Sequence, residues 1–256
     1  MSTNCLLDGR SIIVTGGANG IGRAVALRSA EAGAAVTVTD VGVEDGEAVV
    51  SAIKANGGRA QFFRVDVVNE DQVRASIDAA MSTFGRLDGA CNAAGMTFMG
   101  VPMDEIPIDF WERVHAVNLR GLFLSMKYQA KAMLTGGGGS IVNIASTAGV
   151  AGIPNGAEYC SSKAGVIGVT RGAAVDYARR GIRVNVVLPG ATRTQMMQQV
   201  FDRTEGMEAI VVENNPMGRL AEPDEVAFAV RWLLSAESSF ITGVALPVDG
   251  GLTGCL

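Results

Sequence analysis

Short segments rich in β-branched residues alternate with longer segments of helical period along the whole chain. Because a strand, a helix and a second strand form a right-handed crossover unit, this alternation predicts a parallel sheet with helices on both faces. In such a doubly wound sheet, ligands bind beyond the carboxyl ends of the strands. We predict seven strands, at residues 11–15, 35–40, 60–64, 88–91, 140–145, 183–187 and 244–248.

The composition predicts one globular domain over residues 1–256. Apolar residues make up 48% of the chain and charged residues 18%, which is enough apolar material to cover both faces of a sheet. No Pro/Ser-rich linker divides the sequence. Residues 192–216 interrupt the alternation with a Met-rich helical pattern, and an insertion of this kind over a crevice often forms a substrate lid. A plain surface helix is the alternative for this segment.

Charge and cysteine usage exclude several classes of partner. The net charge is −5 and no basic run is interleaved with aromatic residues, so we do not expect nucleic acid to bind. No apolar stretch approaches the roughly 20 residues of a membrane span, and residues 1–10 lack a signal-peptide pattern. We therefore expect a cytoplasmic protein without a membrane partner. The four scattered cysteines and single histidine fit neither a disulfide framework nor a zinc site, so no metal is predicted.

A glycine-rich turn follows the first predicted strand and opens a helix predicted at residues 20–32. Its glycines let the backbone turn sharply and approach a pyrophosphate, whose charge the helix N-terminal amides would face. The position between strand and helix predicts a dinucleotide site, and a plain structural turn is the alternative. The residues predicted to bind here are Gly16, Asn19, Gly20, Ile21 and Gly22.

Asp40 ends the second predicted strand. A carboxylate at this point accepts hydrogen bonds from both hydroxyls of an adenosine ribose and repels a 2′-phosphate. Neither 17–19 nor 41–43 contains the Arg or Lys that would neutralise the extra phosphate of NADP. The sequence therefore predicts NAD as the cofactor, and a solvated residue at a strand end is the alternative for Asp40.

A candidate catalytic set follows the fifth predicted strand. Ser146 comes directly after it, and Tyr159 and Lys163 lie four positions apart in a helical pattern, which puts them on one helix face. A phenol has a pKa of about 10 in water, so Tyr159 needs a nearby positive charge to act as a base, and Lys163 supplies one. Ser146 would bind the substrate oxygen. This set predicts hydride transfer between a secondary alcohol or ketone and NAD.

These motifs together resemble the short-chain dehydrogenase/reductase family, from Gly9 to about Gly251. Besides the glycine turn and the Ser, Tyr-x-x-x-Lys set, the resemblance rests on Asp66-Val67, Asn92-Ala93-Ala94-Gly95, Asn118, Pro189-Gly190 with Thr194, and Val248-Asp249-Gly250-Gly251. The resemblance implies a single-domain Rossmann-type fold. It also implies a homotetramer, with the helices predicted near residues 109–133 and 157–180 as candidate contacts.

The resemblance adds roles for further residues. It implies that Asn118 joins Ser146, Tyr159 and Lys163 as a catalytic residue by holding a water in a proton relay, and that Lys163 also clasps the ribose. Thr194 would meet the carboxamide. The sequence departs from the family at Ala93, often Asn, and at Gln195, often Pro. The remaining cofactor contacts that it implies are Asp66, Val67, Asn92, Ala93, Gly95, Tyr159, Pro189, Gly190 and Thr192, for which plain packing is the alternative.

The residues expected around the substrate are mostly apolar. Adaptable Met side chains suit a hydrophobic secondary alcohol, cyclic rather than a polyol, and no Arg cluster awaits a carboxylate or phosphate. The alternatives are a 3-oxoacyl thioester reductase, a hydroxysteroid dehydrogenase and, remotely, a non-catalytic dinucleotide sensor. The predicted substrate contacts are Ser146, Thr97, Ile153, Met196 and Met197.

Overall fold

Seven parallel strands form the central sheet of the computed structural model, which describes residues 5–203 and 205–255. The strands lie in the order β3-β2-β1-β4-β5-β6-β7, which confirms the predicted doubly wound sheet. All seven predicted strands overlap observed ones. Their bounds are β1 Ser11–Thr15, β2 Ala35–Asp40, β3 Arg59–Arg64, β4 Gly89–Asn92, β5 Gly139–Ile144, β6 Ile182–Pro189 and β7 Ala245–Val248.

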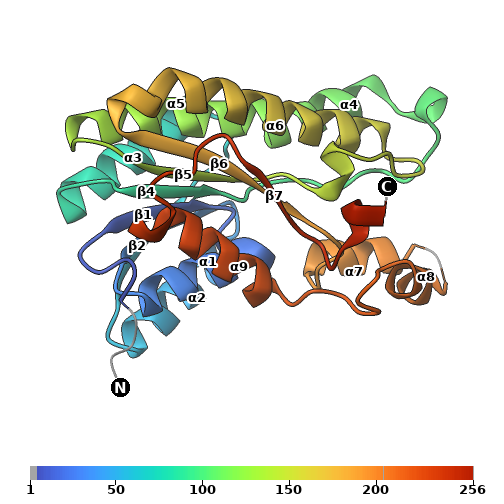
Figure 1. Ribbon diagram of the computed structural model, residues 1–256, viewed down its shortest axis with the longest axis horizontal. Coiled ribbons are helices and arrows are strands. Elements are labelled where there is room, and N and C mark those ends of the chain that lie inside the picture. The colour runs from blue at the N-terminus through green and yellow to red at the C-terminus, as the bar shows by residue number, and fades with distance from the viewer. Residues whose placement is uncertain (1–4, 204, 256) are drawn as a thin grey trace.

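Helices cover both faces of this sheet (Figure 1). One face carries α1 (Gly20–Glu31), α2 (Val43–Ala55) and α9 (Pro223–Leu234), and the other carries α3 (Glu70–Phe84), α5 (Leu122–Thr135) and α6 (Ala157–Tyr177). Shorter elements connect them: η1 Met103–Glu105, α4 Ile108–His115, η2 Ala116–Gly121, η3 Thr147–Gly149, η4 Ala178–Arg180, α7 Gln195–Phe201, α8 Met207–Glu213, η5 Ala236–Ser238 and η6 Leu252–Cys255.

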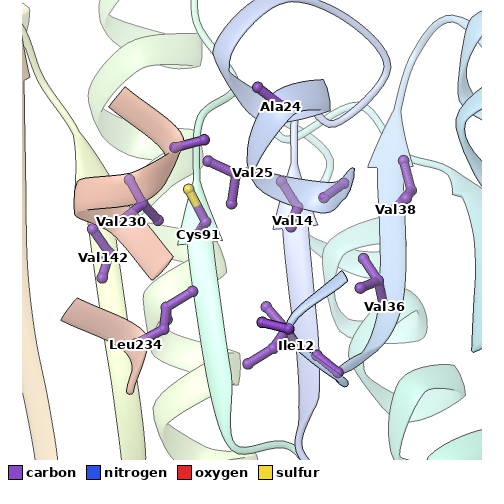
Figure 2. Close-up of a cluster of buried hydrophobic side chains, with 14 of the residues drawn as sticks. Ile12, Val14, Ala24, Val25, Val36, Val38, Cys91, Val142, Val230 and Leu234 are labelled. Atoms are coloured by element: carbon purple, nitrogen blue, oxygen red, sulfur yellow. The ribbon is translucent and has the colours of Figure 1, made fainter. Parts of the chain in front are cut away.

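The core consists of two apolar layers, one on each face of the sheet. Figure 2 shows the first, where Val14 of β1 and Val38 of β2 face Val25 of α1, while Leu234 of α9 lies over the neighbouring strands. Every residue of β1 is buried, because helices cover both of its faces. Complete burial of one such aliphatic side chain stabilises the fold by about 1.5–3 kcal/mol.

The strand order reverses between β1 and β4. The chain runs outward from β1 through β2 to β3, then returns to place β4 on the other side of β1, with Thr15 beside Asn92 at their ends. The crossovers therefore leave in opposite directions at this point, and a crevice opens beyond the carboxyl ends of these two strands. The glycine-rich turn follows β1 directly.

The predicted helix over residues 109–133 is not continuous. A π-helical segment, η2, separates α4 from α5 and contains the buried residue Asn118. Wider turns of this kind occur mostly at functional positions, because they reorient a side chain within an otherwise regular helix. The apolar spacing of the sequence does not distinguish such a turn from a regular one.

Residues 192–216 form two short helices, α7 and α8, which lie together at one end of the molecule (Figure 1). Neither helix contributes a buried residue. The predicted Met-rich helix is thus two separate helices, which are set apart from the two core layers. Within the described residues, no helix is both long enough and apolar enough to span a membrane.

Candidate active site

The glycine-rich turn between β1 and α1 has no room for side chains. Gly16 has a φ of +65°, and a Cβ atom there would lie 2.6 Å from the backbone of Ala94. A Cβ atom on Gly22 would lie 2.0 Å from the carbonyl oxygen of Gly16. The turn is therefore pressed against the end of β4, and its bare backbone lies at the N-terminus of α1. This geometry fits a cradle for a pyrophosphate.

Asp40 is joined to this turn by its carboxylate. One oxygen accepts a hydrogen bond from the amide of Ala18 at 3.1 Å, and the other accepts one from the amide of Gly42 at 3.0 Å. The carboxylate thus links the glycine turn to the loop after β2, which brings it to the position expected for a ribose contact. Asn19 is also tied to this side of the molecule, because its amide donates to Asp45 at 3.0 Å.

Asp66 and Val67 follow β3 at the same edge of the sheet. Asp66 accepts a hydrogen bond from the amide of Val68 at 3.1 Å, which closes a tight turn. Val67 is buried and contacts Gly121 of η2, where a Cβ atom would lie 2.7 Å from a methyl group of Val67. Val67 therefore packs against the π-helical segment, while Asp66 remains at the edge of the crevice.

Asn92 lies in the core rather than in the crevice. Its amide donates to Gln129 at 3.0 Å and to Asn143 at 2.9 Å, and it accepts a hydrogen bond from Gln129 at 2.8 Å. Asn143 in turn donates to Thr170 of α6. This buried network fixes the end of β4, so the side chain of Asn92 supports the following residues, Ala93 to Gly95, from beneath.

Ser146, Tyr159 and Lys163 meet at the carboxyl end of β5. The Nζ atom of Lys163 donates to the carbonyl oxygen of Ile144 at 3.0 Å and lies 5.5 Å from the centroid of the Tyr159 ring. Ser146 forms a hydrogen bond with Tyr159. Its Oγ atom also accepts one from the amide of Ala148 at 3.1 Å, which caps η3. The fold thus brings together the three side chains that the sequence singled out.

Burial determines the protonation of this pair. Burial raises the pKa of Tyr159, and the hydrogen bond with Ser146 only partly opposes that rise. Burial also lowers the pKa of Lys163 to about 8. The sequence predicted that Lys163 favours the phenolate of Tyr159, and burial acts on the pKa of this phenol in the opposite direction.

Asn118 joins the loop after β4 to α6. Its Oδ1 atom accepts a hydrogen bond from the amide of Met96 at 2.7 Å, and its Nδ2 atom donates to the carbonyl oxygen of Met96 at 3.1 Å. The Nδ2 atom also donates to Ser162 at 3.1 Å. Gly95 lies beside both Asn118 and Lys163, since a Cβ atom there would be 3.3 Å and 3.6 Å from their polar atoms. The π-helical segment therefore places Asn118 next to the Tyr159–Lys163 pair.

Residues 189–194 connect β6 to α7 and cross back toward the glycine turn. Thr192 donates to the carbonyl oxygen of Gly190 at 3.0 Å, and Gly190 fits closely against Asp249. Pro189 is the last residue of β6. Thr194 caps α7 by accepting from the amide of Met197 at 3.2 Å, and its methyl group lies by Gly20. Of the predicted cofactor residues of this segment, Thr194 thus lies beside the turn after β1.

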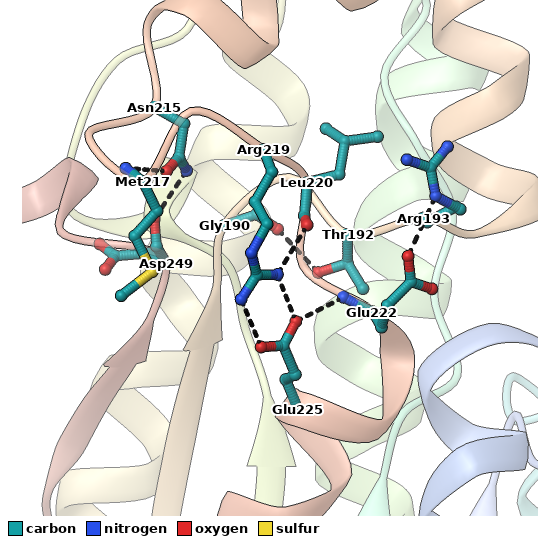
Figure 3. A network of polar contacts seen from close by, with 10 residues as sticks. All are labelled: Gly190, Thr192, Arg193, Asn215, Met217, Arg219, Leu220, Glu222, Glu225 and Asp249. Carbon is teal, nitrogen blue, oxygen red and sulfur yellow. Dashed lines mark hydrogen bonds and ion pairs between the residues drawn. The ribbon is translucent and has the colours of Figure 1, made fainter.

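Polar contacts hold both ends of the 192–216 segment (Figure 3). At its start, Arg193 donates to Glu222 at 3.1 Å. At its end, Asn215 donates to the carbonyl oxygen of Asp249 at 2.9 Å. Just beyond, Arg219 pairs with Glu225 of α9 at 2.7 Å. The base of the segment is therefore fixed to β7 and to the first turn of α9.

Comparison with known proteins gives consistent matches over almost the whole chain. Residues 16–253 match the family described as enoyl-(acyl carrier protein) reductase. A 2,5-dichloro-2,5-cyclohexadiene-1,4-diol dehydrogenase of Sphingobium indicum is 46% identical over 248 residues, which is 96% of this chain and 98% of the relative. A cyclohexanol dehydrogenase of Acinetobacter sp. is 42% identical, covering 94% of each chain.

The solved structures agree. The crystal structure of levodione reductase has a TM-score of 0.94 and 36% sequence identity, covering 98% of this chain and 100% of that one. The chain belongs to the short-chain dehydrogenase/reductase family. It is accordingly an oxidoreductase that acts on CH–OH groups, and its family binds a nicotinamide dinucleotide.

The expected substrate residues of this short-chain dehydrogenase lie on the loop after β4, before α6 and on α7. Ile153 lies close to Gly156, on the same side as Phe98. Phe98 is directly beside Tyr159, with ring centroids 6.0 Å apart, and it follows the predicted contact Thr97 in the loop after β4. Met196 is 36% exposed and Met197 half-buried, both on α7. Within residues 5–203 and 205–255, no group of three His, Cys, Asp or Glu residues could hold a metal ion.

Sequence reasoning missed two charged residues at this site. Glu158, directly before Tyr159, is fully buried, although an acidic residue in the first turn of a helix is ordinarily solvated. Arg203, beyond the end of α7, donates to the carbonyl oxygens of Phe98 and Met99. Neither contact has a local sequence signal, because both join residues that are far apart in the chain.

Proposed function

We propose that this short-chain dehydrogenase oxidises a hydrophobic cyclic secondary alcohol to the corresponding ketone with NAD. The observation that carries the proposal is the meeting of Ser146, Tyr159 and Lys163 at the end of β5, beside the crevice between β1 and β4. When bound there, NAD supplies the hydride acceptor. Retention of both Tyr159 and Lys163 argues against a non-catalytic dinucleotide sensor.

The preference for NAD over NADP rests on Asp40. Both of its carboxylate oxygens are already fixed by the amides of Ala18 and Gly42, so its charge stays at the edge of the glycine turn. A fixed negative charge at this point repels a 2′-phosphate, and the neighbouring residues 17–19 and 41–43 supply no Arg or Lys to offset it. Thr194, next to Gly20, is the proposed contact on the nicotinamide side.

Proton transfer is assigned to Tyr159. In alcohol oxidation its phenolate takes the hydroxyl proton of the substrate, while the Ser146 hydroxyl holds the substrate oxygen in reach. Lys163, held by the carbonyl oxygen of Ile144, favours the phenolate when it is charged. Asn118 holds the loop at Met96 beside this pair and is the proposed next member of the proton path. Because burial raises the pKa of Tyr159, oxidation should accelerate as the pH rises, and it should gain less above about pH 8, where Lys163 loses its charge.

A cyclic substrate is favoured by two independent observations. The wall beside Tyr159 is supplied by Phe98, with Ile153 close to it, and both offer apolar contact. The two dehydrogenases from Sphingobium and Acinetobacter are named for ring alcohols, namely a cyclohexadienediol and cyclohexanol. We further propose that the 192–216 segment is the lid over this site, fixed at its base by the contacts in Figure 3.

We also propose a cytoplasmic homotetramer. An apolar groove on α4, η2, α5 and α6 is lined by residues that include Trp111, Leu119 and Val169. Phe123 in the same groove is 49% exposed, which is unusual for a side chain of its size unless another subunit covers it. The four cysteines are free thiols, as suits a reducing compartment.

The test is a rate measurement at 340 nm with NAD and NADP in parallel. Substrates are cyclohexanol, a cyclohexanediol, an aliphatic secondary alcohol, a hydroxysteroid and, in the reverse direction, a 3-oxoacyl thioester. We expect the highest kcat/KM for a ring alcohol with NAD. Activity confined to NADP would reject the Asp40 argument, and activity confined to the thioester or the steroid would reject the proposed substrate class.

A further inference from the structure

The loop at residues 96–100 is held from three sides by side chains of distant elements. Asn118 binds both backbone polar atoms of Met96. Glu158 of α6 accepts a hydrogen bond from the amide of Met99 at 2.8 Å. Arg203 donates to the carbonyl oxygens of Phe98 at 2.6 Å and of Met99 at 3.2 Å. A loop without secondary structure of its own is thus fixed at three of its five residues, Met96, Phe98 and Met99.

Glu158 is an unusual residue to find in this position. It is 0% exposed, and its Oε2 atom has no hydrogen-bond partner among the described residues. Leaving a polar atom buried without a partner typically costs about 1–3 kcal/mol, and an apolar residue of similar size would avoid that cost. The contact with Met99 is therefore the positive contribution of this side chain, and it acts on the loop.

The residue that these contacts position is Phe98. Its ring lies beside that of Tyr159 at a tilt of 54°, and the guanidinium carbon of Arg203 lies 6.0 Å from its centroid. Ile153 is close on the same side, because a Cβ atom on Gly156 would meet Ile153 at 2.8 Å and Phe98 at 3.5 Å. A substrate whose oxygen reaches Tyr159 therefore has the face or edge of Phe98 as its neighbour.

Arg203 connects the 192–216 segment to the loop at residues 96–100. The base of that segment is fixed at Arg193 and Asn215, whereas α7 and α8 bury no side chain. The bond from Arg203 to the loop therefore ties the outer part of the segment to the substrate wall. Glu158 and Arg203 grip Met99 through different atoms, one through the amide and the other through the carbonyl oxygen.

We propose that Glu158 and Arg203 are specificity-determining positioning residues, which hold Phe98 beside Tyr159 so that the site selects ring-shaped over linear secondary alcohols. A rigid ring gains from a fixed aromatic wall, while a linear chain can adapt to a displaced one at little cost. This inference rests on the proposed function for its substrate class. It concerns the wall of the site, and the proton chemistry of Tyr159 is unaffected by it.

The experiment uses the full-length enzyme with NAD and compares kcat/KM for cyclohexanol and 2-hexanol. The variants are Glu158→Leu, Glu158→Gln and Arg203→Met, with Phe98→Ala as the reference for a lost wall. Gln retains an oxygen that can accept from Met99, so it should preserve the ratio. Arg179→Met is the matched control, because Arg179 is exposed in η4, at the opposite end of α6 from Tyr159.

We expect Glu158→Leu to lower the ring-to-linear ratio roughly fivefold, the effect of one lost hydrogen bond, and Arg203→Met, which loses two, to lower it at least as much. The change should appear as a higher KM for cyclohexanol with kcat for 2-hexanol unchanged. Glu158→Gln and Arg179→Met should stay within about twofold of the wild type. An unchanged ratio in Arg203→Met, which is exposed and should fold normally, would overturn the specificity role.

Hydrogen–deuterium exchange of the 96–100 loop gives a readout independent of turnover. Exchange should accelerate in Glu158→Leu and Arg203→Met but not in Glu158→Gln, because the amide of Met99 loses its acceptor or its neighbour. Unchanged exchange in both variants would show that Glu158 and Arg203 do not hold the 96–100 loop. A wild-type enzyme that oxidises no ring alcohol refutes the proposed function and the specificity that rests on it, whereas the exchange result still decides whether the loop is held.

Discussion

The dinucleotide side and the substrate side of this enzyme are held together in different ways. Around β1 and α1, the backbone itself is packed, and a single Cβ atom on Gly22 would overlap the chain. The helices α7 and α8 bury no side chain of their own, and a few polar contacts such as those of Arg193 and Arg203 fix the segment. Backbone packing tolerates almost no substitution, whereas side-chain contacts can be replaced singly. The substrate side can therefore change without disturbing the rest of the fold.

Tyr159 lies where the two regions meet, and its substitution should have the largest effect. Tyr159→Phe removes only the hydroxyl group, so the ring that packs against Phe98 remains. We expect kcat to fall by about 10²–10⁴-fold, the usual contribution of a general acid or base. Steady-state rates with cyclohexanol and NAD measure this, with circular dichroism to verify folding. Retention of full turnover would show that the proton path does not run through this residue.

Gly22→Ala tests the claim that the dinucleotide side depends on its backbone. The added methyl group would lie 2.0 Å from the carbonyl oxygen of Gly16, so the turn must move. We expect a loss of about 3 kcal/mol in the free energy of unfolding, together with much weaker NAD binding.

Gly168→Ala is the matched control for this substitution. Gly168 lies within α6, and a Cβ atom there would have no neighbour within 4 Å. Alanine at this position should therefore be neutral or stabilise by about 0.5–1 kcal/mol. Urea unfolding of both variants measures the difference. Equal stability of the two variants would contradict the contrast between the regions.

Lys163→Met tests whether burial between the two regions lowers the pKa of the Lys163 amine in the folded protein. The pKa of Lys163 is about 8 in the folded protein and 10.5 when unperturbed, so unfolding takes up a proton between these values. Wild-type stability, relative to the variant, should therefore be lowest below pH 8. It should rise by about 3 kcal/mol as the pH rises from 8 to 10.5.

Urea unfolding at several pH values, without added dinucleotide, measures this difference. The expected signature is a slope against pH, because a simple packing effect of methionine would shift the two curves by a constant amount. Parallel curves would mean that Lys163 keeps its ordinary pKa in the folded protein.

Met197→Ala should have the smallest effect on stability and activity, because it lies on the substrate side, where single side chains can be replaced. α7 buries no residue, so we expect the melting temperature to change by less than about 2 °C. Loss of apolar contact should raise KM for cyclohexanol about two- to fivefold with little change in kcat. Met103→Ala, at a position that is 74% exposed, is the control and should alter neither value. A large loss of stability in Met197→Ala would show that α7 depends on side-chain packing, which would contradict its place on the substrate side of the comparison.

The sequence predicted the regular part of the molecule well, for a physical reason. A strand covered on both faces is buried along its length and rich in β-branched residues, as β1 and β2 are, and such runs are easily recognised. The glycine turn was equally readable, because its position between a strand and a helix leaves few other uses. The meeting of Ser146, Tyr159 and Lys163 at the end of β5 followed from their spacing and from the chemistry of a phenol beside an amine, and their catalytic roles stay predictions.

The irregular part of the molecule could not be predicted from the sequence, because it depends on contacts between distant residues. The π-helical turn at Asn118 has the same apolar spacing as an α-helix, so residues 109–133 were predicted as one helix. The raised pKa of Tyr159 depends on burial, which spacing does not reveal. The burial of Glu158 and its hydrogen bond could not be predicted for the same reason, since its partner Met99 lies on a distant loop.

The π-helical turn also lets the helix carry one extra residue without a loop. A turn of this kind takes up its additional residue locally, so α4 and α5 keep nearly the phase that a continuous helix would give them. Deleting a single residue between Ala116 and Gly121 would restore a regular turn and change the direction of the side chains within it, including that of Asn118. A shortened chain of this kind would keep its sheet and its dinucleotide cradle while Asn118 no longer reached Met96. At this place, catalytic geometry depends on the count of residues in one turn as much as on their chemistry.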